Sequence, residues 1–147
     1  MKIDNDPMYK DVVKIVNYVY AQLENLPEEE KWETKIKLHS SANSLLFGIA
    51  GALGSNGKPS GIEHEWAYVQ RQAISLRTML NFAYQQKFLE ADPGIMVKLD
   101  SLIEKVEVEL KKALKQSEKS AREEDANWER RYKLWKQANE EIDKATK

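Results

Sequence analysis

The chain has 147 residues, enough for one domain of ordinary size, and its hydrophobic fraction of 41% suffices for a compact core. Its 23 Lys and Arg nearly balance its 24 Asp and Glu, and the net charge of −1 argues against a uniformly basic nucleic-acid-binding domain. The absence of cysteine excludes disulfides and thiolate metal sites. The N-terminus is too polar for a signal peptide, and no stretch approaches the ~20 apolar residues of a membrane span, so we expect a soluble, cytoplasmic protein.

The first helix is expected to begin at Asp6-Pro7, where an acceptor side chain precedes a proline whose missing N–H costs nothing in the first turn. Apolar residues then recur at steps of three and four, which is typical of an amphipathic helix. They are Met8, Val12, Ile15, Val19, Leu23 and Leu26. We expect this helix to end at Asn25 and Leu26, and the second helix to begin at Pro27.

The second helix is expected to carry three glutamates in its first turn, where the helix dipole favours acids, and two apolar stripes farther on. The first stripe comprises Trp32, Ile36, His39, Asn43, Leu46, Ala50 and Leu53, and the second comprises Leu38, Ala42, Leu45, Ile49 and Ala52. From residue 42 to residue 53 almost every side chain is small or apolar. Because such a helix must be covered on more than one side, we expect a surface outside the bundle to cover part of it.

A loop rich in Gly, Pro and Ser at 54–61 precedes a third helix, which we expect to stop near Phe88. Its apolar face comprises Ile62, Trp66, Val69, Ala73, Leu76, Leu80 and Ala83. Asp92-Pro93 then repeats the opening of the first helix. The fourth helix carries Ile95, Leu99, Leu102, Val106, Leu110 and Ala113 on its apolar face. Residues 1–114 are therefore expected to form an all-α, up-down four-helix bundle.

Residues 115–147 are expected to form a long C-terminal helical extension. Between 115 and 127 the segment is crowded with charges of both signs and has no Gly or Pro, which favours a solvated helix laced by i,i+4 ion pairs. Trp128, Tyr132 and Trp135 follow at i, i+4 and i+7, interleaved with cations. The pattern suits either stacking on nucleic acid or docking of the rings into a protein groove. Because the spacing places the rings on one stripe, we favour docking.

The residues give little support for chemistry. His39 and His64 are the only histidines, and neither follows a glutamate by three positions, as di-iron bundles require. Lys58 follows Gly57 but lacks the remaining Walker glycine and the Ser or Thr of a P-loop. No residue is placed to orient either imidazole in a catalytic triad. We therefore expect no enzymatic activity, no metal, no cofactor and no small-molecule substrate, and we interpret His39 as a hydrogen-bonded core or interface residue.

Two sets of residues are candidates for binding. Arg77 lies between apolar positions, so we expect its guanidinium to meet a defined partner, either a carboxylate on another helix or an RNA phosphate. The candidate nucleic-acid contacts are Lys31, Lys35, Lys37, Arg71 and Arg77, although lysine runs of this kind are usually a solvated face. The candidate interface residues are Trp32, Leu46, Phe47, Trp66, Trp128, Tyr132 and Trp135.

The chain resembles the four-helix bundle family named after 23S ribosomal RNA intervening-sequence proteins, which includes the Avd-like accessory proteins of diversity-generating retroelements. The resemblance spans residues 12–114. It rests on the segment LPEEEKW at 26–32, on the small and apolar residues at 40–53, on the Gly/Ser/Lys loop, and on AISLRTMLNFA at 73–83. It implies an up-down bundle that assembles as a homopentamer. In the Avd-like branch, it implies binding to structured RNA and to a reverse transcriptase.

Two functions are therefore open. The first, implied by the resemblance, is an RNA-binding accessory protein of a retroelement. The second is a protein-only assembly or scaffold module whose C-terminal helix docks a partner or a neighbouring subunit. Phosphate neutralisation supplies most sequence-independent RNA affinity, and the net charge is −1, with Lys35 and Lys37 where the family has paired arginines. The residues by themselves therefore favour the second function.

Overall fold

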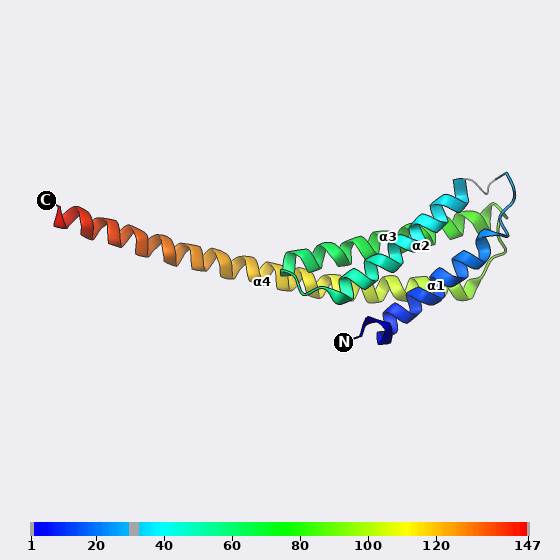
Figure 1. Cartoon of the computed structure of the whole chain (residues 1–147), viewed down its shortest axis with the longest axis horizontal. Coiled ribbons are helices and arrows are strands. Elements are labelled where there is room, and N and C mark those ends of the chain that lie inside the picture. The colour runs from blue at the N-terminus through cyan, green and yellow to red at the C-terminus, as the bar shows by residue number, and fades with distance from the viewer. Residues whose placement is uncertain (1, 30–32, 147) are drawn as a thin grey trace.

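The computed structural model describes residues 2–29 and 33–146, which form helices and no strand. A short 3-10 helix, η1 (Ile3–Asn5), precedes α1 (Pro7–Leu23), α2 (Glu33–Gly54), α3 (Pro59–Gln85) and α4 (Pro93–Ala145) (Figure 1). The all-α prediction is confirmed. Each helix packs on the next, and α4 also packs on α1. This closed order and the short connections give an up-down four-helix bundle.

Local capping fixes where α1 and α4 begin. The Asp6 side chain accepts hydrogen bonds from the backbone N–H groups of Met8 (2.8 Å) and Tyr9 (3.2 Å), and Pro7 is the first residue of α1. Asp92 accepts one from the N–H of Ile95 (3.1 Å), ahead of Pro93. Both predicted openings are confirmed, because a carboxylate before a proline satisfies N–H groups that lack partners within the helix.

The connections on either side of α2 and α3 differ in part from the sequence prediction. The prediction that the second helix begins at Pro27 is wrong, because Glu28 and Glu29 lie in a turn and the helix is described from Glu33. Leu26, which precedes the turn, is buried in the core. That burial anchors the chain where it reverses direction. At its far end α3 stops at Gln85, three residues before Phe88.

The core is built from one stripe of each helix, as the periodicity predicts. On α2 it is the second of the two predicted stripes, with Leu38, Leu45 and Ile49 inaccessible to solvent. The stripes of α1, α3 and α4 also lie in this single cluster, and partly buried residues such as Met8, Ile62 and Leu110 pack against it. The last buried residue of α4 is Ala113.

Beyond Ala113 the helix α4 continues without interruption to Ala145. Ser117 and Ser120 still border a hollow with Lys58 and Ser60, and farther on the helix projects away from the bundle (Figure 1). At 1.5 Å per residue, the segment from 114 to 145 is about 47 Å long. We call this segment the extension. Its helical continuation is confirmed, but the predicted i,i+4 ion pairs are not found among its described residues, since the ion pairs of α4 end at Lys111 and Lys112. Ion pairs between fully solvated side chains gain little free energy.

Candidate functional site

The most prominent surface feature is a row of three aromatic rings on the extension. Trp128 and Tyr132 stack with their ring centroids 5.4 Å apart and an interplanar angle of 5°. Tyr132 and Trp135 follow with centroids 6.0 Å apart and an angle of 26°. The rings are 65%, 48% and 62% exposed in chain order. Because residues three and four apart share one helix face, the rings form one continuous apolar stripe, as the spacing predicts.

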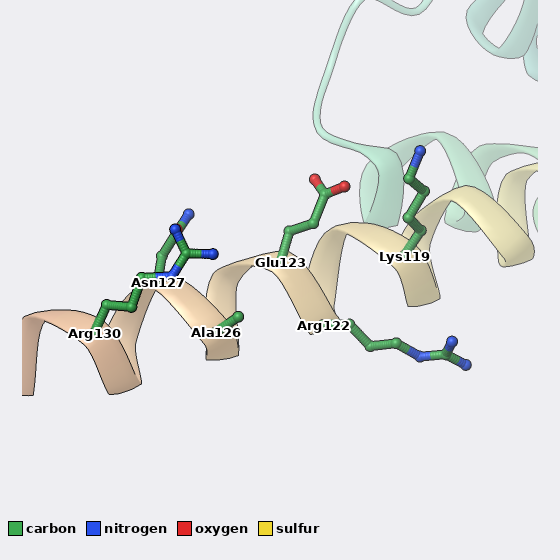
Figure 2. A pocket seen from close by; sticks show the side chains of 6 residues that line it. All are labelled: Lys119, Arg122, Glu123, Ala126, Asn127 and Arg130. Carbon is green, nitrogen blue, oxygen red and sulfur yellow. The ribbon is translucent and has the colours of Figure 1, made fainter.

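Within residues 2–29 and 33–146, no surface of the same bundle receives this stripe, because this part of the extension projects beyond the other helices (Figure 1). Figure 2 shows a hollow at the base of the stripe, and the six residues that line it all belong to α4. Arg122 and Glu123 point to different sides of the helix in this view. A hollow on a single convex helix has no opposite wall, so it is unsuited to enclosing a small ligand.

The helix α2 is covered on both flanks by its own bundle. On the α1 side, the ring of Tyr20 lies 5.3 Å from that of His39, and the Tyr20 hydroxyl donates a hydrogen bond to Asn43 Oδ1. Leu46 and Leu53 pack against the core as partly buried residues. On the α3 side, Gly48 permits a close approach, since a Cβ at this position would lie 3.0 Å from the Tyr68 ring.

A small apolar area of α2 nevertheless remains exposed. Phe47 is 73% exposed and Ile36 is 52% exposed. Phe47 borders a shallow hollow that His64, Glu65 and Arg71 line from α3. The expectation that a surface outside the bundle covers part of helix two stays a prediction, and Phe47 and Ile36 are the large apolar residues of α2 that such a surface would meet. Within the described part of the chain, no cluster of three potential metal-ligating side chains is present.

Three of the five candidate nucleic-acid contacts are engaged with carboxylates. Arg77 meets Asp100 on α4 through two hydrogen bonds, one from Nε to Oδ1 and one from Nη2 to Oδ2 (3.3 Å). Hydrogen bonding to Asp100 raises the pKa of the Arg77 guanidinium above its ordinary value. Of the two partners predicted for Arg77, the structure shows the carboxylate.

The remaining candidate cations divide into paired and unpaired. Lys35 Nζ lies 3.1 Å from Glu24 Oε1, and Lys37 Nζ lies 3.8 Å from Glu33 Oε1. Arg71 is exposed and forms no ion pair with any residue that the structure describes. Lys31 lies outside the described residues. The bundle therefore offers one described candidate cation, Arg71, whose charge is not already opposed by a carboxylate.

The predicted interface residues of the bundle are placed very differently from one another. Trp66 is only 5% exposed and forms part of the core, so its assignment to an interface is wrong. Its spacing on α3 matches the buried stripe, and burial inside the bundle satisfies that pattern. Leu46 is half-buried against the core, Phe47 is exposed, and Trp32 lies outside the described residues. His39 is hydrogen-bonded to Asn43 (3.3 Å) as predicted, but it is exposed and not a core residue.

One polar contact has no clear sequence signal. The hydroxyls of Tyr18 on α1 and Tyr84 on α3 are 2.6 Å apart and partly buried. Burial raises the pKa of both phenols, and the hydrogen bond from the shared contact raises that of Tyr18 further. The contact ties together two helices that face each other diagonally across the bundle. Both tyrosines lie beside apolar stripes, but nothing in their spacing specifies that they meet.

Comparison of the chain with protein-family models, curated proteins and solved structures finds no match. Among the described helices, none combines the length and the apolar character needed to cross a membrane. The candidate functional site therefore rests on the geometry alone, and its dominant element is the aromatic stripe of the extension.

Proposed function

We propose that this protein is a non-enzymatic, homo-oligomeric assembly module whose C-terminal helix docks onto another protein surface. The observation that carries the proposal is the exposed stripe of Trp128, Tyr132 and Trp135 on a helix that projects beyond its own bundle. Tryptophan and tyrosine are enriched at the energetic centres of protein interfaces. Contiguous apolar patches on soluble proteins typically mark such contacts.

The energetics also favour docking of the extension. Full burial of a large apolar side chain is worth about 1.5–3 kcal/mol. Covering the three rings, each of which is about half to two-thirds exposed, would therefore contribute roughly 3–6 kcal/mol per copy. In proteins, most of the stability of a helix comes from tertiary packing of its apolar face and little comes from propensity. A docked partner would therefore also stabilise the extension itself.

The extension is suited to presenting this stripe at a distance from the bundle. The helix α4 contains no Gly or Pro after Gly94, and the extension is continuous with the packed half of this helix. Kinks in helices usually arise at these residues. A straight helix would hold the rings at a defined distance from the core, as a scaffold requires.

The RNA-binding accessory function implied by the family resemblance is the second candidate. Its support is the basic run of Arg130, Arg131, Lys133 and Lys136, which forms no ion pair within the described chain. Against it, Lys35, Lys37 and Arg77 are held by carboxylates, and each of these contacts would compete with a phosphate. We therefore place the assembly function first.

Light scattering of the full chain, beside a truncated chain that ends at Lys115, tests the proposal. We expect the molar mass of the full chain in solution to be a multiple of the 17.0 kDa mass of one copy. A mass of five copies would match the pentamer implied by the resemblance. The truncated chain should contain fewer copies per assembly, or should lose partner binding. Circular dichroism should show that its bundle stays helical. A monodisperse full-length monomer would exclude homo-oligomerisation. Association that is unaffected by the truncation would assign the contact to the bundle.

A further inference from the structure

The aromatic stripe belongs to a longer row with alternating steps of three and four residues. The row comprises Asp125, Trp128, Tyr132, Trp135, Asn139 and Ile142. This alternation is the spacing of a coiled-coil seam, and all six residues lie on one continuous helix. We call this row the seam. One flank of the seam carries a charged row at seven-residue intervals, namely Arg122, Glu129, Lys136 and Asp143.

From this arrangement we propose that the extensions of two copies of the chain pair with each other, antiparallel, with Tyr132 of each copy opposite Trp135 of the other. The inference deepens the proposed function, on which it rests, by naming the partner as a second copy of the same helix. In this register each of these seam residues lies at the same level as a seam residue of the other copy, which forms the layers of a coiled coil. Trp128 then lies opposite Asn139, whose amide oxygen is an acceptor that an indole N–H can reach.

Charge complementarity selects the second copy as the occupant. In antiparallel pairs the corresponding flanking rows of the two helices face each other across the seam. The proposed register therefore sets Glu129 against Lys136 of the second copy and Arg122 against Asp143 of the second copy. Two-fold symmetry repeats both contacts, which gives four contacts of opposite sign. None of these four side chains forms an ion pair within the described part of its own chain.

The neighbouring antiparallel registers bring like charges together. A shift of one heptad in one direction places Lys136 against Lys136 of the second copy and Glu129 against Asp143. The opposite shift places Glu129 against Glu129 and Arg122 against Lys136. Like charges at such positions destabilise a pair and thereby exclude wrong registers.

The parallel arrangement is also disfavoured. In a parallel coiled coil each residue of one flanking row faces the other helix's opposite flanking row five positions farther along the chain. This would set Glu124 against Glu129 and Arg131 against Lys136 of the second copy. Both contacts join like charges, and symmetry repeats them. The charge pattern therefore favours one orientation and one register.

The surface available is adequate for a specific pair. The overlap runs from about residue 121 to residue 146, a length of about 38 Å at 1.5 Å per residue. Six aromatic rings lie in it, each with roughly 100 Å² of its surface exposed in the single chain. The rings alone supply on the order of 600 Å², about half of the ~1,200 Å² at the lower end of stable interfaces. The rest of the seam and the stems of the flanking charges would supply the remainder.

Charge reversal in the full-length chain tests the register. We expect Glu129→Lys and Lys136→Glu to weaken self-association about tenfold each in sedimentation equilibrium at low salt, because each creates two like-charged contacts. The double variant that carries both changes restores opposite charges, so its dissociation constant should return to within about threefold of the original. A mixture of the two single variants should form the mixed pair in preference to either self-pair. In a parallel pair each single change would instead strengthen self-association, because it would replace like-charged contacts by contacts of opposite charge.

A distance measurement tests the orientation independently. The chain contains no cysteine, so Ala121→Cys introduces one site for a spin label. Antiparallel pairing in the proposed register separates the two labels by about 38 Å along the helix axis, whereas parallel pairing brings them together. A short label-to-label distance, or equal behaviour of all the charge variants, would overturn the inference.

These outcomes separate this inference from the proposed function. If association requires the extension but the charge variants have unchanged dissociation constants, the antiparallel pair is overturned and the assembly function stands. A full-length monomer would overturn both. A monomer whose extension binds RNA at low salt would assign the basic residues to phosphate contacts and would also overturn both.

Discussion

Replacing Trp135 by Ser while using Leu134→Ser as the matched control gives the most direct measure of what the aromatic stripe does. The two side chains are neighbours on the same helix and are almost equally exposed, at 62% and 66%. They differ in direction, since Leu134 lies off the stripe. In the isolated chain both substitutions should change the free energy of unfolding by at most about 0.5 kcal/mol, as is usual for surface positions.

The magnitude follows from the exposed ring. A tryptophan buries about 150–250 Å² when fully covered, so 62% exposure leaves roughly 90–150 Å² to be covered by a docked partner. At about 25 cal/mol per Å², this area is worth roughly 2–4 kcal/mol. Since 1.4 kcal/mol corresponds to a factor of about ten, Trp135→Ser should weaken docking by about 30-fold or more.

The assay is the dissociation constant of the full-length assembly, measured by sedimentation equilibrium, with circular dichroism and the thermal midpoint measured on the same samples. Leu134→Ser should stay within about threefold of the unchanged chain. Equal effects of the two substitutions would refute the reasoning, because they would show that the stripe is not covered in the assembly. A large loss of helicity in the Trp135 variant alone would show that the ring acts within its own helix.

Two further predictions concern the bundle. Leu45→Ala should destabilise the fold by about 2–5 kcal/mol in denaturant unfolding, because Leu45 is fully buried. Phe47→Ser, at 73% exposure, should cost at most about 0.5 kcal/mol. Equal costs would contradict the assignment of the inward face of α2. Burial raises the pKa of Tyr18 and Tyr84, so the folded state favours the neutral phenols. Their contribution to folding stability is fully present below about pH 10, the ordinary tyrosine pKa. It is lost as the pH rises through the raised pKa values of the folded state. The double Phe variant should therefore lose less stability than the unchanged chain between pH 9 and pH 12 (roughly the range in which tyrosines ionise), and parallel stability curves would contradict this.

The sequence by itself determines the features that depend on residues a few positions apart. Asp6 and Asp92 cap their helices because the acceptor, the proline and the N–H groups lie within four residues of one another. The buried stripes of α1, α3 and α4 follow from periodicity for the same reason. The alignment of Trp128, Tyr132 and Trp135 is also a property of one helix, so it needs no tertiary information.

The tertiary structure decides which of several apolar positions face inward. Both Trp66 and Phe47 are large apolar residues on helices, yet one is core and the other is exposed, because the neighbouring helices cover only one side of each. The partner of Arg77 is Asp100, 23 residues away, and Tyr18 meets Tyr84 across the bundle. Contacts of this kind depend on how whole helices are placed against one another, and local spacing carries no record of that placement.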